Sequence, residues 1–222
     1  MPIYNAQILK IDAKETRRYA GLIRAKNFSE QSILDACDEA VLLLNVRGIW
    51  KIYDYDAENN LVMSMPPFKL EGKTITRHLK FCEKVICIAV TVGDEIENEV
   101  TRRFGKGNYV ESVLLDAAAT AAVEQAADSL EKAIAPQLNK DGFKMRSRFS
   151  PGYGDWELTN QKIFFDITGA AEIGMSLSSA MMLMPRKSIT AIIGLEKNKL
   201  DDEISSDKNC SLCDRLDCPA RS

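Results

Sequence analysis

The chain reads RFSPGYGDW from Arg148 to Trp156, and this stretch decides how the rest of the sequence is interpreted. Its proline and two glycines exclude a helix or an inner strand, so we expect a loop. Gly152 and Gly154 allow a positive φ or a close approach of the backbone to a ligand. An arginine beside such a turn suits a carboxylate or a phosphate, which its guanidinium can hold with two parallel hydrogen bonds. The stretch therefore predicts either a site for a small, flat, anionic or zwitterionic ligand, or a structural turn whose aromatics plug the edge of a core.

Length and composition narrow the class of protein. A chain of 222 residues is long enough to bury a sizeable core, and a net charge of -3 provides no basic surface for nucleic acid. No apolar run reaches membrane-spanning length, and the first residues do not resemble a signal peptide. We therefore expect a cytoplasmic protein with no nucleic-acid or membrane partner, in which the six cysteines are thiols or metal ligands rather than disulfides.

The order of predicted strands and helices is irregular, which favours an α+β fold. A β-branched run predicts a buried strand over residues 84–92, with Cys87 inside it, and alternation predicts another over residues 48–55. We also expect strands over residues 161–167 and 188–194. Predicted helices cover residues 13–25, 30–44 (with Ser29 as N-cap), 94–104 and 110–134.

The longest predicted helix carries an alanine-rich face that includes one carboxylate. Helical spacing places Glu124 on the same face as Ala117, Ala121 and Asp128. A carboxylate among small residues either lies at the solvent boundary or points at a cationic group. Glu124 is therefore a candidate partner for an ammonium or hydroxyl group of a ligand, with a solvated helix face as the alternative.

Common catalytic and nucleotide-binding motifs are missing from the sequence. His78 is the only histidine and no G-x-S-x-G motif accompanies it, so we expect a helix-surface or capping role rather than catalysis. No glycine pattern matches a dinucleotide-binding fingerprint or a phosphate-binding P-loop.

Three cysteines near the C-terminus form a second constellation. Cys210 and Cys213 have the spacing of thiolate metal sites, and Cys218 follows within reach. Three thiolates could hold zinc or an iron–sulfur cluster if a fourth ligand were supplied. Thiol redox chemistry, or no chemistry, are the other interpretations, and no fourth ligand is evident.

From Arg148 onward the sequence resembles the S-adenosylmethionine-binding activation domain of cobalamin-dependent methionine synthase. Arg148, Gly152 and Tyr153 match its R-x-x-x-G-Y signature, and Pro151 is also present. Residues 173–190, which contain the run MPRKSIT from Met184, resemble the second signature block of that family. Asp155 and Trp156 continue the loop differently from the full-length synthases, which suggests a branch in which the domain stands alone.

The resemblance implies a fold, a ligand and a set of binding residues. It implies a mainly antiparallel sheet flanked by helices, with Arg148 holding the methionine carboxylate of S-adenosylmethionine. The backbone around Ser150, Gly152 and Tyr153 would contact the adenine, and Glu124 matches a helical glutamate near the ligand. A further family aspartate, which meets the methionine amino group, has no assigned counterpart here.

The resemblance also implies a domain layout and partners. Residues 1–200 would form one activation-domain-like unit with its ligand-binding half at about 110–195, and residues 201–222 a polar, cysteine-containing tail. A corrinoid-binding methyltransferase or methionine synthase modules would supply cobalamin, and an electron donor protein would reduce it. This chain would then be one component of a methyltransferase system that supports reductive methylation of cobalamin, rather than a complete enzyme.

The alternative is a metal or redox protein acting through Cys210, Cys213 and Cys218, and it makes its own prediction. Anaerobically purified protein should then contain zinc or show the visible absorption of an iron–sulfur cluster, and truncation at Lys208 should remove it. Colourless, metal-free protein whose function survives the truncation would end this alternative.

Overall fold

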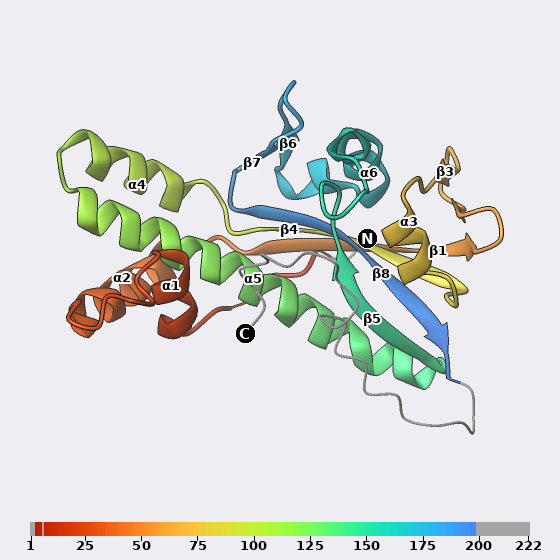
Figure 1. Cartoon of the computed structure of the whole chain (residues 1–222), viewed down its shortest axis with the longest axis horizontal. Helices are drawn as coiled ribbons and strands as arrows, with labels where there is room; N and C mark the ends of the chain where they lie inside the picture. The colour runs from red at the N-terminus through yellow and green to blue at the C-terminus, as the bar shows by residue number, and fades with distance from the viewer. Residues whose placement is uncertain (1–2, 6, 199–222) are drawn as a thin grey trace.

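The computed structural model describes residues 3–5 and 7–198. Six strands form one antiparallel sheet in the order β3-β2-β1-β4-β8-β5 (Figure 1). A separate two-stranded hairpin pairs β6 (Ser176–Leu177) with β7 (Leu183–Met184). The strands of the large sheet are β1 (Arg47–Asp56), β2 (Leu61–Val62), β3 (Phe68–Lys69), β4 (Lys84–Thr91), β5 (Phe143–Phe149) and β8 (Ser188–Lys197).

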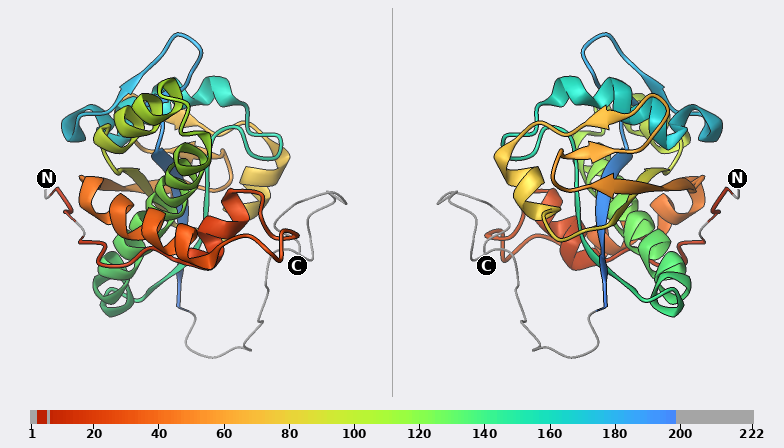
Figure 2. Two further views of the ribbon diagram at one scale, coloured as in Figure 1. Left: turned by 90° about the vertical axis from the view of Figure 1, so that its left-hand side faces the viewer. Right: turned by 90° about the vertical axis from the view of Figure 1, so that its right-hand side faces the viewer.

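Helices cover both faces of this sheet. The long helix α5 lies across one face together with α1 and α2, while α3 and α6 lie on the other face (Figures 1 and 2). This arrangement confirms the expected α+β fold with an antiparallel sheet flanked by helices. The helices are α1 (Ala13–Tyr19), α2 (Glu30–Leu43), α3 (Lys73–His78), α4 (Glu95–Gly105), α5 (Tyr109–Lys140) and α6 (Gln161–Thr168), with 3-10 turns at Leu158–Asn160 and Ala170–Ile173.

The alternation of side chains along the central strands builds two cores. Ile86 and Ile88 of β4 pack in the core beneath α5, whereas Val85 and Cys87 pack on the side of α3 and α6. Because β4 is covered on both faces, its sequence is continuously apolar, as expected for an inner strand. Cys87 is fully buried in this strand, which confirms its predicted position.

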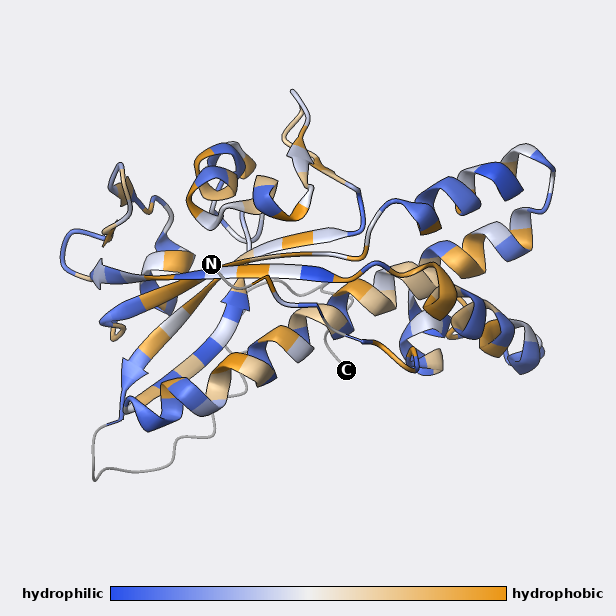
Figure 3. Ribbon diagram, turned by 180° about the vertical axis from the view of Figure 1, so that it is seen from behind, coloured by the Kyte–Doolittle hydropathy of each residue, from blue (hydrophilic) through white to orange (hydrophobic). Residues whose placement is uncertain are grey.

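Helix α5 approaches the sheet and its neighbouring helices through its alanines. Ala118, Ala122 and Ala126 have no exposed surface and belong to the core that includes residues of α1 and α2. Hydrophobic residues concentrate in the sheet and on α5, whereas α4 is mostly hydrophilic (Figure 3). None of the helices in the described residues is long and apolar enough to cross a membrane.

Three sequence expectations about local structure are wrong. The helix predicted over residues 13–25 ends at Tyr19. Residues 161–167, predicted as a strand, form helix α6, in which Phe164 and Ile167 turn toward the sheet and Asp166 stays exposed. A short apolar run fits either a strand or the buried face of a helix, so the spacing of its apolar residues does not distinguish the two. Arg148 and Phe149, expected in a loop, are the last residues of β5. Strand β5 lies at the sheet edge, so the exclusion of an inner strand holds.

The predicted N-cap of α2 is confirmed. The Ser29 hydroxyl accepts a hydrogen bond from Ser32 N at 3.2 Å and so caps α2 as predicted. The predicted tail with Cys210, Cys213 and Cys218 lies outside the described residues, and the metal expectation for it stays a prediction.

The packing of α5 predicts a sharp difference between two identical substitutions. Ala122→Leu should lower the free energy of unfolding by about 1–3 kcal/mol, because a fully buried alanine leaves no room for the added carbons. Ala133→Leu on the exposed side of the same helix is the control and should change it by less than about 0.5 kcal/mol. Urea denaturation of both variants measures the difference. Equal effects would contradict close packing of α5.

Candidate functional site

A cavity of about 490 Å³ lies where α5, the end of β5 and the start of β8 meet. Four of the five predicted binding residues line it: Glu124, Arg148, Ser150 and Tyr153. Gly152 does not. The second signature block forms the opposite wall, so the two stretches that carried the resemblance meet in one cavity. This wall consists of Leu183 and residues 186–190.

An irregularity in β5 aims Arg148 into the cavity. Met145 pairs with Leu195 and Arg148 with Ile193, so three steps along β5 match two along β8, and one residue of β5 is extra. Because of this extra residue, side chains after the bulge point to the opposite face of the sheet from the one that an uninterrupted strand would give them. Arg146 bonds Glu196 on the face covered by α3, whereas Arg148 points to the other face and bonds carboxylates of α5.

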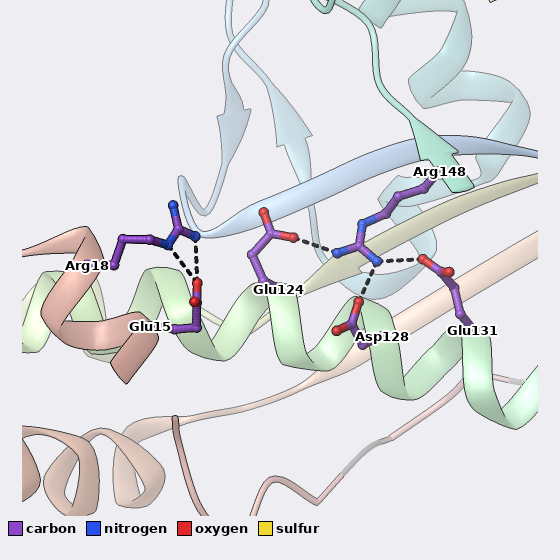
Figure 4. A network of polar contacts seen from close by, with 6 residues as sticks. All are labelled: Glu15, Arg18, Glu124, Asp128, Glu131 and Arg148. Atoms are coloured by element: carbon purple, nitrogen blue, oxygen red, sulfur yellow. Dashed lines mark hydrogen bonds and ion pairs between the residues drawn. The ribbon is translucent and has the colours of Figure 1, made fainter. Parts of the chain in front are cut away.

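Three carboxylates of α5 surround the Arg148 guanidinium (Figure 4). Its Nη1 donates hydrogen bonds to Asp128 Oδ1 and Glu131 Oε1, both at 2.6 Å. Its Nη2 donates one to Glu124 Oε2 at 2.7 Å. Glu124 therefore contacts a cationic group of the protein itself while its side chain stays 40% exposed, and its role as a ligand partner stays a prediction.

Two of the five N–H groups of Arg148 form no hydrogen bond with the described residues. A guanidinium carries five N–H groups, and both hydrogens of Nη1 and one of Nη2 are used. Nε and the second Nη2 hydrogen have no hydrogen-bond partner among the described residues. Burial disfavours the charged form of Arg148, but the hydrogen bonds to Asp128, Glu131 and Glu124 outweigh it and raise the pKa above the ordinary arginine value. The guanidinium is therefore permanently charged.

The loop after β5 divides its aromatics between core and cavity. Trp156 is only 1% exposed and packs edge-on against Phe164, so for this residue the structural-turn interpretation is correct. Tyr153 is 65% exposed and lines the cavity. Gly152 has φ +92 and donates its N–H to Trp156 O at 2.8 Å, which closes the turn that presents Tyr153.

The opposite wall is held by α4 and α5. Glu97 of α4, 8% exposed, accepts hydrogen bonds from Lys187 N at 2.7 Å and from Arg186 Nε at 3.4 Å. Lys187 Nζ donates to Thr120 Oγ1 at 2.8 Å and pairs with Asp116 at 2.9 Å. The second signature block is part of the resemblance, but the sequence alone does not identify Glu97, Arg186 and Lys187 as residues of the site.

Gln161 is a further cavity residue that the sequence did not reveal. It is 3% exposed, and its Nε2 donates to Thr190 Oγ1 at 2.6 Å, which ties the first turn of α6 to β8 at the cavity. The sequence predicts a strand over residues 161–167, whereas Gln161 is the first residue of helix α6.

The described cysteines do not add to a metal site. Cys37, Cys82 and Cys87 are all buried, and no group of three potential metal ligands occurs within residues 3–5 and 7–198. Burial raises the pKa of the Cys82 thiol to about 12, and it also raises the pKa of Cys37 and Cys87. These thiols are therefore protonated at neutral pH and are poor metal ligands.

No family model and no curated protein matches this sequence. Among solved structures, a crystal structure of the MetH reactivation domain bound to AdoHcy is similar, with a TM-score of 0.59. The alignment covers 91% of this chain and 81% of that chain. This chain has the fold of the MetH reactivation domain. With 13% sequence identity, the similarity to that domain establishes the fold alone.

The buried carboxylate behind the second wall gives a stability prediction. Glu97→Ala should lower the free energy of unfolding by about 1–3 kcal/mol, because it leaves the Lys187 N–H without its acceptor. Glu95→Ala is the matched control on the same helix. Glu95 is exposed in the first turn, where a carboxylate interacts chiefly with the helix dipole, so the loss should stay below about 1 kcal/mol. Urea denaturation distinguishes the two, and equal losses would show that Glu97 does not anchor this wall.

Proposed function

We propose that the cavity binds S-adenosylmethionine and that the protein presents its methyl group to cobalamin held by a corrinoid partner. The partner would be methionine synthase or another corrinoid methyltransferase, and the reaction the reductive reactivation of its oxidised cobalamin. One observation carries the proposal: both signature blocks line a single cavity in a chain with the fold of the MetH reactivation domain. The solved neighbour holds AdoHcy, the demethylated form of S-adenosylmethionine.

The residues around the cavity match the chemistry of this ligand. The unused Nε and Nη2 hydrogens of Arg148 suit the methionine carboxylate. Glu124 lies beside them as an acceptor for the ammonium group or a counter-charge for the sulfonium. Tyr153, with Phe149 behind it at 6.5 Å between ring centroids, offers an aromatic surface for the adenine.

In this proposal the protein contributes binding and orientation. S-adenosylmethionine supplies an electrophilic methyl group that needs no acid or base to be activated. Arg148 fixes one end of the ligand and the turn at Tyr153 the other, so that the methyl group is held in one orientation toward the cavity opening. An electron donor protein and the corrinoid partner complete the system, and this chain acts as their methyl-donor subunit.

The binding proposal predicts an effect of Arg148 on affinity. Calorimetric titration with S-adenosylmethionine should show binding that Arg148→Ala weakens by at least about tenfold, the scale of a lost charge-assisted pair. Arg102→Ala is the control, because Arg102 forms an exposed ion pair with Glu99 on α4 and does not line the cavity. Its affinity should match that of the unmodified protein. Absence of binding both by the free protein and by its complex with a corrinoid protein would refute the proposal.

A further inference from the structure

The bulge in β5 exposes a backbone carbonyl that α3 satisfies. Ser147 lies between Met145 and Arg148, where the pairing with β8 is interrupted. Its carbonyl oxygen accepts a hydrogen bond from His78 Nε2 at 2.8 Å. Because a carbonyl can only accept, Nε2 carries the hydrogen. The His78 ring also lies 5.7 Å from the Phe149 ring, so the last residue of α3 contacts both neighbours of Arg148.

The first turn of α3 is held by Asp155, which lies in the loop that follows β5. Gly72 precedes the helix and has no side chain to cap it. The Asp155 carboxylate does so instead, accepting hydrogen bonds from Lys73 N at 2.6 Å and Thr74 N at 2.9 Å. The bond to Thr74 N is the main cause of the lowered pKa of Asp155. A Cβ on Gly72 would lie 3.0 Å from Asp155 O, which explains a glycine with φ +132 there.

We propose that α3 positions the ligand-binding segment 148–153 by holding it at both ends, with His78 and Asp155 as its positioning residues. Neither residue lines the cavity, so both act through the backbone of the segment. His78 fixes the bulge that directs Arg148, and Asp155 fixes the turn that presents Tyr153. Trp156 adds an apolar anchor next to Asp155. The proposal rests on the proposed function only for the identity of the ligand.

The first experiment measures the emission of Trp156, which reports on the position of the segment in the absence of any ligand. The chain has two tryptophans, so Trp50→Phe leaves Trp156, next to Asp155, as the only tryptophan whose emission is recorded. In this background Asp155→Ala should shift the emission to longer wavelength, because Trp156 gains solvent contact. Asp155→Asn should give a smaller shift than Asp155→Ala, because its single amide oxygen can still accept a hydrogen bond from one of the two N–H groups. Asp166→Ala, an exposed carboxylate on α6, is the control.

The second experiment measures S-adenosylmethionine affinity by calorimetry. Asp155→Ala should weaken binding by about three- to tenfold, the size of effect expected when a cap is lost and a binding group is displaced. His78→Phe, which keeps a ring against Phe149 but removes the donor to Ser147, should weaken it similarly. Asp155→Asn should weaken binding less than Asp155→Ala, because it keeps one of the two acceptor oxygens. Asp166→Ala should bind like the unmodified protein. Far-UV circular dichroism checks that each variant keeps its secondary structure.

The outcomes separate this inference from the proposed function. Unchanged Trp156 emission in Asp155→Ala, or unchanged affinity in both Asp155→Ala and His78→Phe, would overturn it. Equal loss in Asp155→Asn and Asp155→Ala would also overturn it, because the cap would then not be the cause. If the unmodified protein fails to bind S-adenosylmethionine, the proposed function fails, and the Trp156 emission still decides whether α3 holds the segment.

Discussion

One extra residue in the edge strand β5 determines where the guanidinium of Arg148 lies. In an uninterrupted ladder Ser147 would pair with Ile193 and Arg148 would turn to the α3 side, toward the core around Leu79 and Cys82. An unpaired cation in that core would be costly. The bulge instead places Arg148 over α5, where three carboxylates neutralise it, and leaves Phe149 on the apolar side. The reversal therefore puts Arg148 in the lining of the cavity.

The walls of the cavity are fixed by groups that lie behind them. Glu97 of α4 holds the backbone before β8, and Gln161 ties α6 to the same strand. Helix α5 forms the third wall, and its alanines let it lie close to the sheet. The loop and turn segments that face the cavity are therefore supported by helices on both sides of the sheet.

The sequence predicts strongly patterned elements and misses those whose pattern is ambiguous. The continuous apolar run of β4 and the capped start of α2 at Ser29 were predictable because burial on both faces and N-capping leave direct signals. Strand β5 was missed because alternating cations, such as Lys144 and Arg146, resemble a solvated segment when the strand lies at an edge. The partners of Arg148 were hidden for another reason. The bulge that turns it toward Asp128 and Glu131 depends on the register with β8, which no local pattern encodes.

The three carboxylates around Arg148 have a consequence for turnover. Against one guanidinium they leave an excess of negative charge beside the cavity. S-adenosylmethionine carries one net positive charge, whereas its demethylated product is a neutral zwitterion. In the proposed function this negative charge should make the methyl donor bind more tightly than the product, so that transfer of the methyl group itself promotes release of the product. Added salt should reduce the difference in affinity between donor and product, because it screens charges at a partly exposed site.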